Sequence, residues 1–63
     1  MDESIKLLNE NELSDLIDRG VQTLRNERFK GKGIPYVKIG RSVRYRVSDI
    51  KEYLKKNLVT TQE

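Results

Sequence analysis

Cysteine, histidine and tryptophan are absent from this chain of 63 residues, which also contains a single proline. Without cysteine there is no disulfide and no thiolate metal ligand, and without histidine the most common general base is missing. We therefore expect no catalytic residue, no metal site and no cofactor, and we do not expect an enzyme. No apolar run approaches the length of a membrane span and no signal-peptide pattern is present, so we expect a cytoplasmic protein that does not enter membranes.

The charge of the chain is distributed unevenly. Residues 1–18 carry one lysine against six acids, a balance of −5, whereas residues 19–48 carry nine lysines and arginines against the single Glu27, a balance of +8. Residues 49–63 sum to zero. A strongly basic segment in a chain long enough for only one small domain favours an anionic partner, and the alternative is a solvated basic surface with no partner.

A helix-start signal lies near the N-terminal end of the chain. Asn9 and Glu12 have the spacing of a capping box, in which each side chain bonds to the backbone N–H of the other. Leu8 and Leu13 flank this box with the spacing of a hydrophobic staple. These features predict a helix over residues 10–17.

A tight turn and a second helix are predicted next. Asp18 tolerates a left-handed backbone and Gly20 permits one, so residues 18–20 favour a turn. The second helix begins with Gly20 as a weak N-cap and ends near Phe29. Two short helices joined in this way are typical of a helix-turn-helix motif or of an ordinary helical hairpin packed only for stability. The second helix carries side chains of the types that hydrogen-bond to base edges and phosphates: Gln22, Thr23, Arg25 and Asn26.

Two alternating stretches, YVKI and VRYRV, predict a β-hairpin. A loop of two residues, Gly40 and Arg41, would pair Lys38 with Val43 and mix apolar and basic side chains on each face. A loop of three residues pairs Lys38 with Arg44, and we expect this register because it separates the two kinds of side chain. The like charges of Lys38 and Arg44 would then lie opposite each other, which an anionic partner would relieve. The predicted basic face comprises Lys38, Arg44 and Arg46, with Arg41 at the tip.

A third amphipathic helix follows, with Ser48 as its N-cap and Asp49 in its first turn. We expect the three tyrosines, Tyr36 included, to lie in the core rather than to stack on bases. The expected core unites apolar residues of all the predicted elements: Leu8, Leu13, Leu16, Ile17, Val21, Leu24, Val37, Ile39, Val43, Tyr45, Ile50, Tyr53 and Leu54.

Three segments, LLNENELSDLI, TLRNER and GIPYVKIGRSVRYRVSDIKEYL, together resemble the excisionase-like helix-turn-helix family. These small winged-helix proteins are related to the MerR-type DNA-binding domain and include phage and mobile-element excisionases and AlpA-like regulators. The resemblance covers Leu7 to Leu54 and is most specific over PYVKIGRSVRYRVSDI. It implies an α+β fold, a small winged helix-turn-helix in the order helix, turn, helix, β-hairpin wing, helix.

The resemblance also implies how this chain meets double-stranded DNA. The second helix enters the major groove through Gln22, Thr23, Arg25, Asn26 and Arg28. The wing reaches the neighbouring backbone or minor groove through Lys38, Arg41, Ser42 and Arg44. The chain departs from the family at the turn, where Gly-Val-Ser is common, and at Glu27, where an aromatic residue is common; Phe29 or Tyr36 is expected to fill that space.

From these features we expect a flexible N-terminus over residues 1–6, a DNA-binding domain over residues 7–58 and a disordered tail over residues 59–63. The expected function is that of an excisionase, a recombination directionality factor that binds DNA and assists an integrase. The alternatives are an AlpA-type transcriptional regulator and, in another class, a protein-interaction adaptor. We expect a monomer in solution that binds DNA cooperatively.

Overall fold

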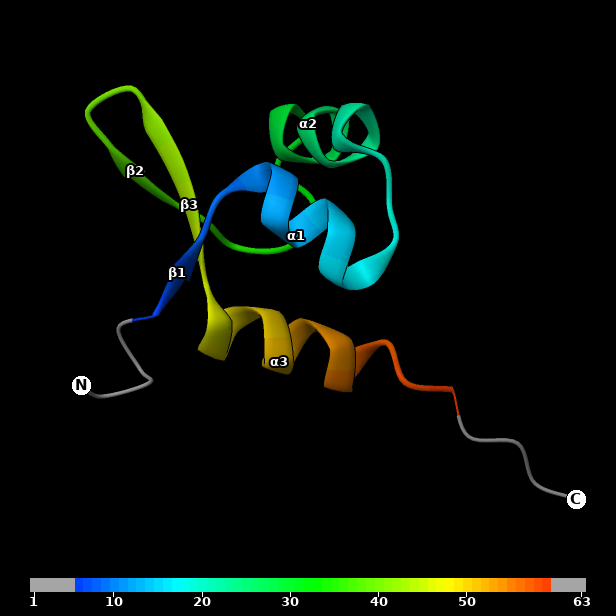
Figure 1. The fold of residues 1–63 in the computed structure, drawn as a ribbon. Helices are drawn as coiled ribbons and strands as arrows, with labels where there is room; N and C mark the ends of the chain where they lie inside the picture. The colour runs from blue at the N-terminus through cyan, green and yellow to red at the C-terminus, as the bar shows by residue number, and fades with distance from the viewer. Residues whose placement is uncertain (1–5, 60–63) are drawn as a thin grey trace, which may run out of the picture.

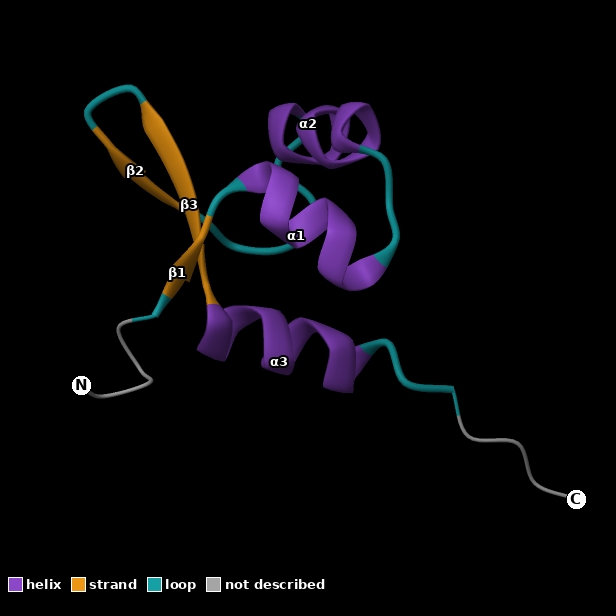
Figure 2. Ribbon diagram, viewed as in Figure 1, coloured by secondary structure: helices purple, strands orange, loops and turns teal. Residues whose placement is uncertain are grey.

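The structure, a computed structural model, describes residues 6–59, which contain three helices and three strands (Figure 1). The central strand β3 pairs antiparallel with β1 on one side and β2 on the other (Figure 2). This arrangement confirms the predicted α+β winged helix-turn-helix. Apart from Lys6 and Val59, the expected flexible terminus and tail lie outside the described residues. The elements in order are β1 (Leu7–Leu8), α1 (Glu10–Ile17), α2 (Val21–Phe29), β2 (Val37–Ile39), β3 (Ser42–Arg46) and α3 (Val47–Lys56).

The first helix begins and ends where local chemistry predicts. The Asn9 side chain accepts a hydrogen bond from the Glu12 backbone N–H at 2.8 Å, and the Glu12 carboxylate accepts one from the Asn9 N–H at 2.9 Å. The helix ends at Asp18, which has a left-handed backbone with φ of 55°. Both the capping box and the left-handed turn residue are therefore confirmed.

The turn between α1 and α2 is held by side-chain contacts. The Ser14 hydroxyl donates to the Arg19 carbonyl oxygen, and the Arg19 guanidinium forms an ion pair with Glu27 on α2. The backbone at Gly33 approaches Glu27 so closely that an added Cβ would lie 3.1 Å from the Glu27 Cβ. Arg19 and Gly33 thus border Glu27. The resemblance implied an aromatic residue at the position of Glu27, and Phe29 or Tyr36 was expected to fill the space that such a residue would occupy.

The core takes one buried side chain from each helix, one from β3 and one from the loop before β2. Leu8, Ile17, Val43 and Tyr53 are partly buried around this cluster. Ile34 was missing from the predicted core because a single apolar residue in a glycine-rich loop has no periodicity to reveal it. The buried cluster comprises Leu13, Leu24, Ile34, Tyr45 and Ile50.

The predicted register of the wing is wrong. β2 and β3 are joined by the two-residue Gly40-Arg41 loop, so that Lys38 pairs with Val43 and Val37 pairs with Arg44. Gly40 has φ of 63°, whereas Arg41 does not have a positive φ. This is the φ pattern of a type II′ turn that has glycine in its first central position. Because this turn matches the twist of the strands, turn geometry prevails over the separation of apolar and basic side chains.

The start of the third helix also differs from the prediction. α3 begins at Val47, with Arg46 rather than Ser48 as its N-cap residue and no side-chain capping bond. Arg46 instead donates two hydrogen bonds to the Asp49 carboxylate, at 2.6 and 3.0 Å. The Val47 N–H donates to the carbonyl oxygen of Lys6 beside β1. The strand and the helix therefore meet without a capping serine.

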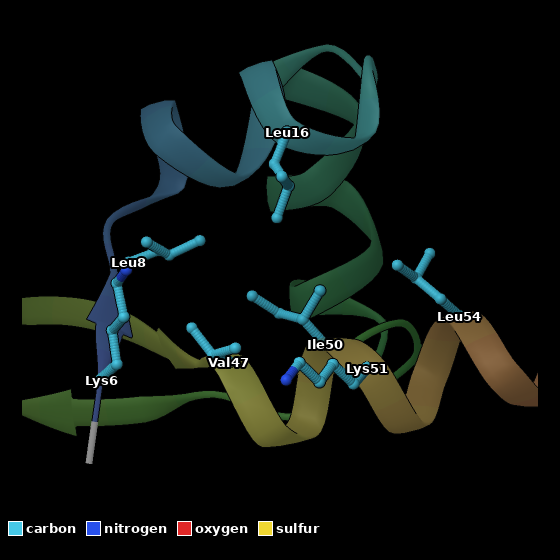
Figure 3. Close-up of a pocket in the computed structure, with 7 residues that line it drawn as sticks. All are labelled: Lys6, Leu8, Leu16, Val47, Ile50, Lys51 and Leu54. Carbon is cyan, nitrogen blue, oxygen red and sulfur yellow. The ribbon is translucent and has the colours of Figure 1, made fainter. Parts of the chain in front are cut away.

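Three residues predicted in the core are exposed: Leu16, Ile39 and Leu54. Leu16 and Leu54 line a hollow of about 450 Å³ between α1 and α3, into which both side chains point (Figure 3). The hollow separates the facing sides of the two helices, so helical periodicity places these leucines on the inner side without burying them. Ile39 lies beside the wing loop, and Tyr36 is likewise exposed rather than in the core.

Candidate nucleic-acid interface

The helix α2 and the tip of the β2–β3 wing lie at the same end of the molecule, and α3 lies at the opposite end (Figure 1). α1 lies between α2 and α3, so it supports α2 from the inner side. Leu24 anchors α2 in the core and leaves its polar side chains at the surface. The arrangement presents one helix and one β-ribbon on a common side of the fold.

The outer face of α2 carries three exposed polar side chains: Gln22, Thr23 and Asn26. The Gln22 Nε2 donates to the Asn26 Oδ1 at 3.2 Å, which links the two amides one helical turn apart. This bond uses one of the two N–H groups of Gln22 and leaves the Asn26 NH₂ group available. The pair retains donors and acceptors of the kind that match adenine in the major groove.

Arg25 is held by a carboxylate on another helix. Its Nε lies 3.2 and 3.0 Å from the two carboxylate oxygens of Glu10, and its Nη2 lies 2.6 Å from Oε2. Hydrogen bonding to Arg25 is the main reason that the pKa of Glu10 lies below its ordinary value, and the same bond raises the pKa of Arg25. Glu10 thus remains ionised at neutral pH, and the pair joins the start of α1 to the middle of α2.

Arg28 points inward rather than toward solvent. Its side chain is only 11% exposed, its Nη1 donates to the Tyr45 hydroxyl at 3.0 Å, and it lies 3.6 Å from a Glu10 oxygen. Its guanidinium carbon also lies 5.6 Å from the ring centres of Phe29 and Tyr36. These contacts connect α2 to β3 and α1, so the geometry of Arg28 suits the positioning of the helix better than contact with DNA.

Phe29 occupies a position that the sequence reasoning did not assign to the interface. The side chain is 78% exposed at the end of α2, so it does not fill the space beside Glu27. Phe29 follows Arg25 by four residues and Asn26 by three, and these spacings place neighbours on one helix surface. An exposed aromatic ring beside polar side chains could contact a thymine methyl group.

The wing does not present the predicted single basic face. Because alternate residues point to opposite faces of a strand, the observed register puts Lys38 on the face of Tyr45 and Arg44 on the opposite face with Arg46. Arg44 donates to the carbonyl oxygen of Val43 at 2.8 Å. The like-charge pair expected between Lys38 and Arg44 therefore does not exist, and the argument for an anion between them falls with it.

The tip of the wing is an accessible part of the predicted interface. Arg41 and Ser42 are both exposed, and Arg41 has no carboxylate partner among residues 6–59. Arg41 lies in the two-residue turn, next to Gly40, whose φ of 63° is the left-handed conformation that glycine favours. The structure brings Gln22, Thr23, Arg25 and Asn26 together on α2 and Arg41 and Ser42 at the tip, and it separates Lys38 from Arg44.

Glu10, like Phe29, is a residue that the sequence reasoning did not assign to the interface. Nothing local in the sequence connects Glu10 to an arginine 15 residues away. The one sequence feature that could have indicated this role is that Glu10 is a carboxylate at the first position of the helix that precedes the turn. Its role depends on the packing of α1 against α2.

Among residues 6–59 no helix has the length and apolar character required to cross a membrane. The same residues contain no group of three or more metal-ligating side chains close enough to hold an ion.

Comparison with known proteins agrees with this architecture. A family model described as a helix-turn-helix domain matches residues 7–58, which is most of the chain. No curated protein and no solved structure gives a significant match. The matched residues span both helices of the motif, the wing and α3. The chain therefore belongs to the helix-turn-helix domain family, whose domain type indicates DNA binding.

Proposed function

We propose that this protein binds double-stranded DNA sequence-specifically and acts as an excisionase of a phage or mobile element. α2 enters the major groove, and the wing tip contacts the neighbouring phosphates. The observation that carries this proposal is that α2, whose polar side chains are exposed, lies at the same end of the molecule as the tip of the wing (Figure 1). Arg41 in this tip has no carboxylate partner among residues 6–59. A major groove about 12 Å wide accepts one helix, which leaves the ribbon to reach the flanking backbone.

The two parts of this surface have different tasks. Gln22, Thr23, Arg25 and Asn26 contact base edges, which distinguish the four base pairs in the major groove. Arg41, Ser42 and Lys38 contact phosphates, which fix the register of the protein without reading sequence. Arg28 acts indirectly, because its bond to Tyr45 holds α2 against the sheet. We assign these tasks to a domain of residues 7–58 that is monomeric in solution and binds neighbouring DNA sites cooperatively.

Selection of DNA from a random pool tests sequence-specific binding. We expect one short preferred motif, and we expect it to change when Gln22 and Asn26 are replaced together by alanine. Lys51→Ala is the matched control, because Lys51 lies on α3 at the opposite end of the molecule. A pool that yields no preferred motif, or binding that does not weaken with added salt, would instead favour a protein-interaction adaptor.

Recombination with the integrase of the same genetic element tests the excisionase role. Added protein should increase excision from a substrate that contains the selected motif beside the attachment site, and scrambling the motif should abolish the effect. If excision is unchanged while the protein alters transcription from a promoter containing the motif, the protein is a regulator of the AlpA type. That result would keep the proposed DNA-binding surface and reject the proposed role in excision.

A further inference from the structure

The strongest unexplained feature of the interface is the arrangement of Arg25 and Glu10 across two helices. A carboxylate beside a DNA-reading helix should repel phosphate, so its presence requires an explanation. Glu10 is only 19% exposed and contacts both Arg25 and Arg28. Because it lies at the first position of α1, the packing of α1 against α2 fixes its place relative to Arg25.

The hydrogen bonds divide the guanidinium of Arg25 into a used edge and an available edge. The edge formed by Nε and Nη2 faces Glu10, with its shortest bond of 2.6 Å from Nη2 to Oε2. Arginine has five N–H donors in a planar fork, so both N–H groups of Nη1 and the second N–H of Nη2 remain available. The available Nη1–Nη2 edge is the end of the side chain, and the side chain remains 47% exposed.

We propose that Glu10 is a positioning residue that fixes Arg25 to read a guanine in the major groove. Guanine offers two adjacent acceptors there, O6 and N7, which match the two parallel donors on the available edge of Arg25. This assignment rests on the proposed function, because it requires α2 to lie in the major groove. It gives that function a specific base preference.

The charge of the pair favours a base over a phosphate. Glu10 neutralises Arg25 locally, which weakens the non-directional attraction of the guanidinium to the DNA backbone while its directional donors remain. The acceptors of guanine are uncharged, so they lose less from this neutralisation than a phosphate does. An arginine already fixed by a carboxylate also loses less side-chain freedom when it binds.

The test compares duplexes in which every position of the selected motif is substituted singly. We expect the wild type to prefer guanine at one position by about fivefold or more, the range of one bidentate contact. Arg25→Lys keeps the charge without the fork and should remove this preference. Glu10→Gln should remove it too, and should make the salt dependence of non-specific binding steeper by about 0.9 as Arg25 moves to a phosphate.

Glu12→Gln is the matched control for charge and for helix stability. It makes the same substitution two residues away on α1, where Glu12 contacts the Asn9 backbone and not Arg25. We expect this variant to retain the guanine preference. A Glu10→Gln variant that retains the preference, or that weakens binding to all four bases equally, would overturn the inference.

A measurement on the wild type covers the case in which Glu10→Gln does not fold. The Arg25 Nε–H resonance in NMR spectra should be protected from exchange in the free protein and should remain so in the specific complex. Loss of this protection on binding the preferred duplex would show that Arg25 leaves Glu10, which overturns the inference. A pool with no preferred motif overturns the proposed function as well, whereas a motif without an Arg25-dependent guanine overturns only the role of Glu10.

Discussion

The salt dependence of DNA binding should reveal how few of the basic residues contact phosphate. Four arginines of the basic segment 19–48 already pair with carboxylates, and they are Arg19, Arg25, Arg28 and Arg46. The remaining five basic side chains of the segment have no carboxylate partner among residues 6–59. These five are Lys30, Lys32, Lys38, Arg41 and Arg44.

The magnitude follows from the number of counterions that bound cations release. Each neutralised phosphate adds about −0.9 to the slope of log affinity against log salt concentration. Five contacts give a slope no steeper than about −4.5, so that raising salt from about 50 to 200 mM weakens binding about 500-fold. If all nine cations bound phosphate, the slope would approach about −8 and the loss would exceed about 50,000-fold.

Fluorescence anisotropy of a labelled duplex of random sequence, titrated at several salt concentrations, measures this slope. Arg41→Gln should make the slope shallower by about 0.9. Arg46→Gln removes the same charge from the same wing but from a residue already paired with Asp49, so it should leave the slope about unchanged. A wild-type slope near −8, or equal effects of the two substitutions, would refute the view that the ion pairs persist on DNA.

Three further predictions concern the fold. Leu13 is 0% exposed and Leu16 is 61% exposed, so Leu13→Ala should cost about 2–5 kcal/mol and Leu16→Ala less than about 1 kcal/mol in urea unfolding monitored by circular dichroism; equal costs would contradict the core described above. Hydrogen bonding to Arg25 lowers the pKa of Glu10, so the contribution of Glu10 to the free energy of unfolding should be complete above about pH 4.5 and lost as pH falls through the lower folded-state pKa. The difference in unfolding free energy between wild type and Glu10→Gln should therefore be larger at pH 6 than at pH 3. A difference that stays constant with pH would contradict this prediction. Gly40→Ala should cost about 1–2 kcal/mol because φ is 63°, whereas Gly20→Ala, at φ of −63°, should be close to neutral by the same assay.

The elements that could be predicted from sequence are those specified by neighbouring residues. The capping box of Asn9 and Glu12 and the left-handed Asp18 set the limits of α1 through contacts within a few residues. The limits of α2, from after Gly20 to Phe29, follow in the same way. Such signals act within one turn of chain, so a single sequence contains them in full.

The features that could not be predicted depend on competition or on distant contacts. Gly40 does signal a type II′ turn, but the alternation of side chains favoured another register, and only the energies of the two could decide between them. β1 has only two residues and forms because β3 offers it an edge. The bond between Glu10 and Arg25 arises only when α1 packs on α2. In the candidate site, residue types led to the prediction that α2 faces DNA, but they did not show which arginines pair with carboxylates.

The pairing of some basic residues with carboxylates bears on how the proposed DNA binding can be both fast and selective. All three lysines of the basic segment lack carboxylate partners among residues 6–59, whereas four of its six arginines have them. A lysine is a mobile point charge suited to attraction at a distance, whereas an arginine presents a planar fork whose value depends on its orientation. Orientation by a carboxylate weakens the long-range pull of an arginine but preserves its directional donors. Under the proposed function, the cations without carboxylate partners among residues 6–59 supply a non-specific attraction and Arg25 supplies discrimination. This proposal predicts that substitutions in the first group alter affinity for all sequences, whereas substitution of Arg25 alters the ratio of affinities between sequences.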